Sequence, residues 1–311
     1  MTAHVVAEHS RSAAHLEELA PGVHAYLQPP GGWCVSNSGV IVGDDLTVVV
    51  DSLATEQRTL RLREEVDALA SGGRRIVVNT HHHGDHVFGN HLFGPDTTVV
   101  AHEEARREMA EAGLVLTGMW PDVPWGDVRV TLPDITFTDR MALDLGSRRV
   151  ELIHVGPAHT TCDVVVWLPE ERVLFAGDVL FSGAAPFVLM GSLSGSFSAL
   201  ETIGRLGPSL IVCGHGEVAG PALIDETVSY LQWVEWMALE GRARGLSPLE
   251  MAGRADMDRY GHLTEPERLV GNLHRAYTEL GGTAPGAALD VAHVFEEMVS
   301  FNGGRLPSCL A

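Results

Sequence analysis

The stretch R-R-I-V-V-N-T-H-H-H-G-D-H-V-F-G-N, residues Arg74 to Asn90, is the part of the chain that decides the fold. Its short apolar run, residues 76–78, predicts a strand that ends near Thr80. Three imidazoles and one carboxylate follow within six residues: His81, His83, Asp85 and His86. Without a cation, these side chains would repel one another, or their desolvation would cost free energy that no interaction compensates. The sequence therefore predicts a metal site at the end of a strand.

The composition narrows the possible functions. The chain has 311 residues, of which 45% are hydrophobic and 20% charged, as in an ordinary globular protein. All 21 basic residues are arginine, and the formal net charge is -20. Nucleic-acid binding requires a basic surface, so we expect no nucleic-acid partner. The absence of lysine excludes Schiff-base chemistry and lysine nucleophiles.

Cysteine usage and hydropathy indicate a compartment. The four cysteines form no C-x-x-C pair and suggest no disulfide framework, which fits a reducing cytoplasm: Cys34, Cys162, Cys213 and Cys309. The first ten residues carry acid and histidine where a signal peptide needs a basic start and an apolar core. No run of 18 apolar residues occurs. We expect a cytoplasmic protein with no membrane partner; the sequence leaves the oligomeric state open.

The distribution of apolar residues predicts two strand-rich halves followed by helices. Residues 1–20 are polar and are expected to be frayed. The expected strands are 23–27, 40–42, 47–51, 76–78, 98–101, 136–138, 141–145, 150–155, 164–168, 173–176 and 210–212. The expected helices are 55–71, 102–112, 224–241, 248–257, 265–280 and 287–300. We predict one domain over residues 1–221 and a helical extension over residues 222–311 packed on it.

Three further residues of ligand type lie at or beside predicted strand ends. His159 follows a Gly-Pro turn, Asp178 follows the strand 173–176, and His215 lies between two glycines. With the first cluster they make a set of seven candidate metal ligands. Histidines elsewhere in the helical part, such as His262, are expected to be surface or core residues, and His102 a structural residue at a helix start.

The motifs resemble those of a known superfamily. T-H-x-H-x-D-H at 80–86, G-P-x-H-T at 156–160, F-x-G-D at 175–178 and G-H-G at 214–216 resemble the metallo-β-lactamase-fold superfamily, in that order. The resemblance covers roughly residues 20–220 and implies an α/β (α+β) fold, a four-layer αβ/βα sandwich with metals at the edge between two stacked sheets. Asp178 stands where some β-lactamases of this superfamily have cysteine, which favours the broader hydrolase branch.

The resemblance also implies a ligand set. His81, His83 and His159 would hold one metal; Asp85, His86 and His215 would hold the second; Asp178 would bridge them. Two Zn²⁺ ions suit this donor set best, although iron and manganese also accept histidine and aspartate. Asp85 would be the catalytic residue that receives a proton. His82 should point away from the metals, and Asp163 should fix the loop that carries His159.

Three stretches resemble a narrower group: residues 31–37, residues 177–192 and the ending F-N-G-G-R-L-P-S-C-L-A. They are similar to the second-ring cyclases of aromatic (type II) polyketide biosynthesis, of actinorhodin type. This implies a poly-β-ketone substrate, free or held on an acyl carrier protein, and ring closure by aldol-type condensation with loss of water. The implied substrate-binding residues are Trp33, Trp120, Trp125, Phe187 and Met190. The loops that carry Trp33 and Trp120 are also explained by simple packing.

Two other functions remain open on the sequence alone. A thioesterase or lactone hydrolase of glyoxalase-II type would use the same metals with water as the nucleophile, and it would release a free acid. A metal-binding protein without turnover is the third class, and the complete ligand set argues against it. An acidic carrier protein would be repelled by this chain, so a carrier-bound substrate predicts a local arginine patch near the site, at Arg106-Arg107 or Arg148-Arg149.

Overall fold

The computed structural model describes residues 14–70 and 73–311 and arranges their strands in two sheets. The first sheet has the order β1 (His15–Ala20), β2 (Val23–Leu27), β3 (Ser38–Val42), β4 (Leu46–Val50), β5 (Arg74–Val78), β6 (Thr98–His102), β7 (Ile135–Phe137). The second has the order β12 (Leu210–His215), β11 (Val173–Phe181), β10 (Val164–Leu168), β9 (Arg149–His154), β8 (Arg140–Asp144). Parallel pairing runs from β4 to β7 and between β11 and β12.

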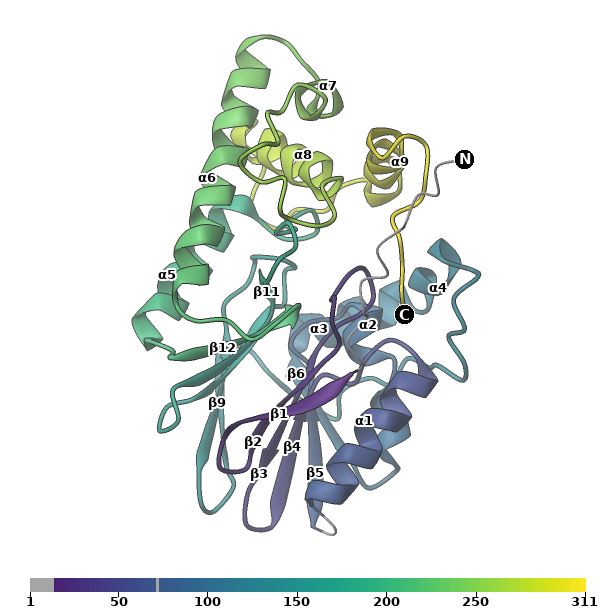
Figure 1. Cartoon of the computed structure of the whole chain (residues 1–311), viewed down its shortest axis with the longest axis vertical. Helices are drawn as coiled ribbons and strands as arrows, with labels where there is room; N and C mark the ends of the chain where they lie inside the picture. The colour runs from purple at the N-terminus through teal and green to yellow at the C-terminus, as the bar shows by residue number, and fades with distance from the viewer. Residues whose placement is uncertain (1–13, 71–72) are drawn as a thin grey trace, which may run out of the picture.

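The two sheets face each other across an apolar core and are covered by helices on their outer sides (Figure 1). Valine, leucine and phenylalanine side chains from both sheets fill the space between them. On the first sheet, α1 (Glu56–Leu69) packs its Leu62 and Val66 against the strands, and α3 (Glu103–Ala112) follows β6. On the second sheet, α5 (Leu193–Leu206) and α6 (Ala222–Ala243) share one large core cluster with the strands. The predicted four-layer sandwich is confirmed.

The helices after α6 form the upper part of the molecule in Figure 1. They are α7 (Pro248–Ala252), α8 (Arg268–Leu280) and α9 (Val291–Phe301). Leu269 and Leu273 of α8 pack in the same cluster as Phe187 and Leu189, which precede α5. The apolar core therefore continues from the sandwich into the C-terminal helices, and the boundary between residues 221 and 222 stays a prediction.

The chain after α9 returns to the sandwich. Cys309 forms a parallel β-bridge with Trp33, and the Trp120 indole donates a hydrogen bond to the carbonyl of Pro307 at 2.8 Å. Arg58 donates from one guanidinium nitrogen to the carbonyl of Leu310 at 2.5 Å. The tail is thus packed onto the loops that surround the predicted metal site.

Several boundaries differ from the sequence-based prediction. Residues 15–20, expected to be frayed, form β1, because this polar segment pairs as an edge strand with β2; residues 1–13 lie outside the described part of the chain. The strands 173–176 and 210–212 continue to Phe181 and His215, and the helix expected over 248–257 ends at Ala252. Helix α5 was not predicted, because glycine and serine have low helix propensity; its N-cap is Ser192, whose side chain accepts from Gly195 N–H.

Shorter elements complete the description. They are α2 (Gly84–Val87), a 3₁₀ turn at Asn90–Phe93 and α4 (Val115–Met119). Across the described ranges, every helix is too short or too polar to traverse a lipid bilayer.

Candidate metal centre

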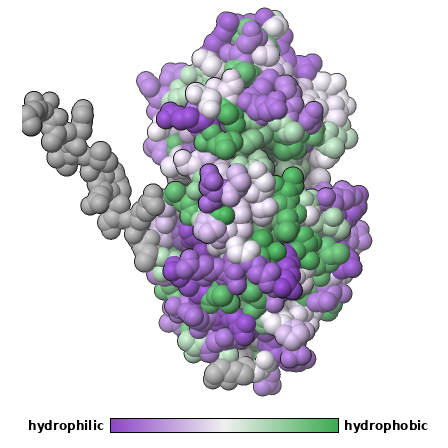
Figure 2. Space-filling model, turned by 90° about the vertical axis from the view of Figure 1, so that its right-hand side faces the viewer, coloured by the Kyte–Doolittle hydropathy of each residue, from purple (hydrophilic) through white to green (hydrophobic). Residues whose placement is uncertain are grey.

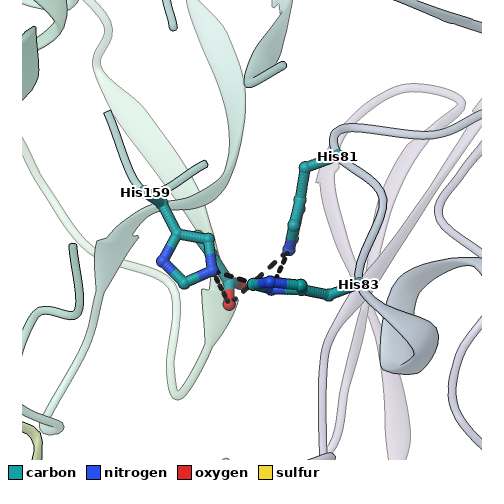
Figure 3. A group of neighbouring side chains, drawn as sticks. His81, His83 and His159 are labelled. Carbon is teal, nitrogen blue, oxygen red and sulfur yellow. Dashed lines mark hydrogen bonds and ion pairs between the residues drawn. The ribbon is translucent and has the colours of Figure 1, made fainter. Parts of the chain in front are cut away.

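The seven predicted ligands come together at one edge of the two sheets. His81 and His83 lie on the loop after β5, and Asp85 and His86 lie in α2. His159 lies on the loop between β9 and β10, and Asp178 and His215 lie in β11 and β12. Figure 3 shows the rings of His81, His83 and His159 converging from the two sheets onto one point. The topology thus joins four sequence segments that are up to about 130 residues apart.

The side chains form two groups whose donor atoms face one another. In the first, Nδ1 of His83 lies 3.1 Å from Nε2 of His81 and 3.0 Å from Nε2 of His159. In the second, Oδ2 of Asp85 lies 3.3 Å from Nε2 of His215 and 3.7 Å from Nε2 of His86. All members of each group are close enough to share one ion.

The Asp178 carboxylate lies between the two groups. Its Oδ2 is 3.4 Å from Nε2 of both His159 and His215, and its Oδ1 is 3.2 Å from Nε2 of His86. A Cβ at Gly214 would lie 1.8 Å from Oδ1 of Asp178, so only glycine allows the carboxylate this position. The arrangement is the one that a bridging ligand requires.

Each histidine has its outer ring nitrogen held by a neighbour. Nδ1 of His86 donates to Oδ2 of Asp51 at 2.8 Å, and Nδ1 of His159 donates to the Phe187 carbonyl at 2.6 Å. The remaining three partners are Thr80 Oγ1 for His81 (3.0 Å), Met190 Sδ for His83 (3.3 Å) and the Gly32 carbonyl for His215 (3.1 Å). Such contacts fix the tautomer and the ring orientation, and they leave the inner nitrogen free to bind a metal.

Two observations show that the centre fits divalent metal ions. Nε2 of His86 and Oδ1 of Asp178 are buried and make no hydrogen bond, although they lie 3.2 Å from each other and buried polar atoms are normally hydrogen-bonded. Burial also lowers the pKa of His159 to about 4, so this imidazole is neutral and can act as a ligand. Five imidazoles and two carboxylates, with no thiolate, are a donor set that zinc accepts.

A third cluster lies behind the centre and consists of His82, Glu108 and Cys162. Nδ1 of His82 donates to Oε2 of Glu108 at 2.7 Å, and Thr161 Oγ1 donates to the other oxygen of Glu108. His82 therefore points away from the two ligand groups, as predicted. The polar atoms of this cluster satisfy one another, in contrast to His86 Nε2 and Asp178 Oδ1, so the cluster is explained without an ion.

The predicted supporting residues are also in place. Oδ2 of Asp163 accepts from the backbone N–H groups of Ala158 and Thr160, on either side of His159, at 3.1 and 2.9 Å. Burial raises the pKa of Asp163 to about 7. His102 caps α3 by accepting from Glu104 N–H. Arg148 and Arg149 lie at the start of β9, at the end of the strand away from His159, so they are not near the centre.

The predicted substrate-binding residues occupy different environments. Trp33 packs against Trp120 and Phe187, with ring centroids 5.8 and 5.4 Å apart, and Phe187 lies 6.1 Å from the His159 ring. Trp125 instead packs on Phe88. Trp120, Trp125 and Phe187 are each no more than 8% exposed, whereas Trp33 and Met190 are partly exposed. A role of these five residues in substrate binding stays a prediction.

Asp51 is a functional residue that the sequence analysis missed. It was read only as the last residue of a strand, yet its carboxylate accepts from Thr80 N, Thr80 Oγ1 and His86 Nδ1, each at 2.8 Å. It lies directly after β4, the strand parallel to β5, and this position beside the His-rich strand end was the available signal.

Asp51→Asn is expected to weaken metal binding at His86. The amide nitrogen would donate to Nδ1 of His86 and move the imidazole proton to Nε2, the nitrogen that faces the second ligand group. Loss of such a partner costs about 10–100-fold in metal affinity. Zinc content after dialysis against buffered zinc measures the loss. Ser38→Ala is the matched control, because Ser38 touches only the backbone carbonyl of Asp51. Equal zinc content in both variants would contradict the role assigned to Asp51.

Solved structures show the same fold. A metallo-β-lactamase from Pontibacter korlensis superposes with a TM-score of 0.58 at 19% identity, covering 71% of this chain and 99% of that one. A stereoselective inverting sec-alkylsulfatase from Pseudomonas sp. gives 0.68 at 16% identity, covering 87% of this chain and 51% of that one.

Curated relatives match in sequence. A hydroxyacylglutathione hydrolase from Methylococcus capsulatus is 30% identical over 155 residues, 48% of this chain and 52% of the relative, so the chain spans about half of that protein. A type 2 metallo-β-lactamase from Bacteroides fragilis is 25% identical over 234 residues, 71% of this chain and 86% of the relative. The described residues of this chain include two neighbouring groups of side chains that could each hold a metal ion. The family model described as the metallo-beta-lactamase superfamily matches residues 31–215, more than half of the chain. The chain therefore belongs to the metallo-β-lactamase superfamily.

Proposed function

We propose that this protein is a dinuclear zinc hydrolase that cleaves an acyl thioester or a lactone. The observation that carries the proposal is the ligand set, in which the carboxylate of Asp178 occupies the shared position and no thiolate takes part. The sequence match to hydroxyacylglutathione hydrolases supports the thioester. Hydrolysis of a thioester or lactone was the alternative considered from the sequence, and the relatives favour it over the cyclase.

The chain supplies the groups that such a hydrolysis needs. When bound, zinc ions make water nucleophilic at neutral pH and polarise a carbonyl group. Burial alone would raise the pKa of Asp85, but His86 and His215 lower it, so the carboxylate is ionised and able to accept a proton from the attacking water. Water then adds to the acyl carbon, the carbon–sulfur or carbon–oxygen bond breaks, and the leaving group takes up the proton.

The surroundings of the centre suit an apolar acyl group. Phe187 lies beside the ring of His159, and Trp33 packs against Phe187 and Phe295 with ring centroids 5.4 and 6.5 Å apart. Figure 2 shows apolar residues gathered where the upper helices meet the sandwich, on the face that carries α4 and α9. Exposed apolar residues of α4 and the tail include Val115 and Leu306, which are 68% and 51% exposed.

The second candidate is the polyketide cyclase, with a poly-β-ketone as substrate. The same aromatic side chains favour it, because a folded poly-β-ketone needs an apolar wall beside the metals. In this reaction Asp85 would take the α-proton of the ketone, and carbon rather than water would attack the carbonyl.

Product analysis separates the two candidates. The zinc-loaded protein is incubated with a hydroxyacylglutathione thioester, a lactone and a monocyclic poly-β-ketone thioester, and the products are identified by mass. A hydrolase yields the free acid and the thiol from a thioester, or the hydroxy acid from the lactone, so that the products together are one water heavier than the substrate. A cyclase yields a ring-closed product that has lost water. His83→Ala, which removes a ligand of the first group, is the inactive control. Absence of free acid from every substrate would overturn the hydrolase proposal.

A further inference from the structure

One face of helix α8 carries four polar residues that contact the segment leading from β11 to α5. Arg268, Asn272, Arg275 and Glu279 follow the spacing i, i+4, i+7, i+11, which places them in one stripe along the helix. Three of them are almost fully buried: Arg268 at 2%, Asn272 at 0% and Arg275 at 1% exposed. We call these four residues the α8 stripe. It lies outside residues 31–215, the part of the chain that matches the family.

The α8 stripe hydrogen-bonds the backbone of residues 185–194. Arg268 donates to the Ala185 carbonyl at 3.0 Å, and Asn272 donates to the Pro186 carbonyl at 2.7 Å. The remaining contacts are Val188 N to Asn272 Oδ1 (2.9 Å), Arg275 Nε and Nη2 to the Leu189 carbonyl (3.0 and 2.7 Å), and Leu193 N and Ser194 N to Glu279 (2.9 and 3.0 Å).

Residues 185–188 need these partners because they are buried and form neither strand nor helix. Buried backbone N–H and C=O groups without a partner are costly, and a segment outside regular structure cannot pair them internally. Gly271 allows the close approach, since a Cβ there would lie 2.7 Å from the ring of Phe187. The position of the segment is therefore set by side chains of α8.

Residues of the same segment contact the rings of two predicted metal ligands, His159 and His83. The Phe187 carbonyl accepts from Nδ1 of His159 at 2.6 Å, and Sδ of Met190 lies 3.3 Å from Nε2 of His83. Phe187 lies between the two residues that Asn272 binds, Pro186 and Val188. A shift of this segment would turn both imidazoles away from the point where their inner nitrogens meet.

We propose that the α8 stripe positions His159 and His83. Helix α8 would thus complete a zinc site whose ligands all lie within residues 31–215, the part of the chain that matches the family. Asn272 is the central positioning residue, and it acts through the Phe187 carbonyl without touching metal or substrate. This inference concerns metal binding and does not depend on which bond the enzyme cleaves.

Zinc titration of Asn272→Ala tests the proposal. We expect affinity for one of the two ions to fall about 10–100-fold, as for other groups that orient a ligand, with the second ion bound as before. In the Co²⁺-loaded protein, the visible absorption of the corresponding ion should change. Thr227→Val on α6 is the matched control: Thr227 is also buried, and the variant loses one side-chain hydrogen bond, which Thr227 donates to the Leu223 carbonyl of its own helix. It should retain both affinities and the Co²⁺ spectrum.

A second pair of variants tests the proposal independently, in case Asn272→Ala does not fold. Arg275→Lys keeps a donor for the Leu189 carbonyl, whereas Arg275→Met removes it. We expect Arg275→Met to bind the same ion more weakly than the original chain does. Arg275→Lys should bind that ion with an affinity between those of the original chain and Arg275→Met. Unchanged affinity for both ions in the folded variants, whatever their melting temperatures, would show that the stripe is only structural and would overturn the proposal.

Discussion

Asp178→Asn is expected to reduce kcat/KM by about a thousandfold, because a loss of about 4 kcal/mol of metal-assisted stabilisation corresponds to that factor. Among residues 14–70 and 73–311, Asp178 is the carboxylate that faces both ligand groups, with oxygen atoms 3.2–3.4 Å from His86, His159 and His215. Asparagine has nearly the same shape, but it carries no charge and has one oxygen atom that can bind a metal instead of two. Both ions should therefore be held more weakly, and the zinc content per chain should fall below two.

Folding of this variant is checked by circular dichroism, since the substitution also removes a buried charge. Gly214 leaves room for an amide as well as for a carboxylate, so the fold should be kept. Glu151→Gln, an exchange of the same chemistry on β9 away from the centre, should leave kcat/KM unchanged. Full activity and two bound ions in Asp178→Asn would show that the carboxylate is not shared.

Removal of the metal ions by a chelator should lower the melting temperature by roughly 10 °C. A ligand at a thousand times its Kd stabilises the folded state by about 4 kcal/mol, and each kcal/mol corresponds to about 2–4 °C for chains of 150–250 residues. The ions bind side chains from both sheets, which the unfolded chain does not bring together. Differential scanning calorimetry with and without chelator measures the shift, and added zinc should reverse it.

Asp178→Asn provides the comparison for this measurement. The shift caused by the chelator should be smaller in the variant than in the original chain, because weaker binding contributes less stabilisation. A melting temperature that does not respond to chelator in the original chain would argue that the seven side chains do not hold metal ions under these conditions.

The sequence was sufficient to predict the fold class and the set of metal ligands, because both rest on short motifs whose order resembles the metallo-β-lactamase-fold superfamily. The apolar runs and the H-x-H-x-D-H motif are contiguous, and the isolated residues His159, Asp178 and His215 each follow a recognisable strand or turn. The structure places all seven in two neighbouring groups. The apolar segments predicted two strand-rich halves with flanking helices, and the resemblance of the motifs to the superfamily implied that these halves form a two-sheet sandwich.

Contacts that depend on tertiary packing were not predicted. Asp51 carries no local motif, and its role arises because β4 and β5 are parallel neighbours. For the four α8 residues the sequence predicts only a helix over residues 265–280, because a single helix does not reveal which irregular segment it will contact. Helix α5 was hidden by residues of low helix propensity, and its stability comes from packing and from the Ser192 cap.

The packing of the C-terminal tail has a consequence for the order of events during protein synthesis. The Trp33 indole donates to Glu267, 234 residues later, and Arg58 donates to the carbonyl of Leu310, 252 residues later. On the ribosome, the loop that carries Trp33 emerges long before either partner. Contacts of such long sequence separation form late, so the hydrogen bond from Arg58 to the C-terminal tail can be made only after translation has passed residue 310.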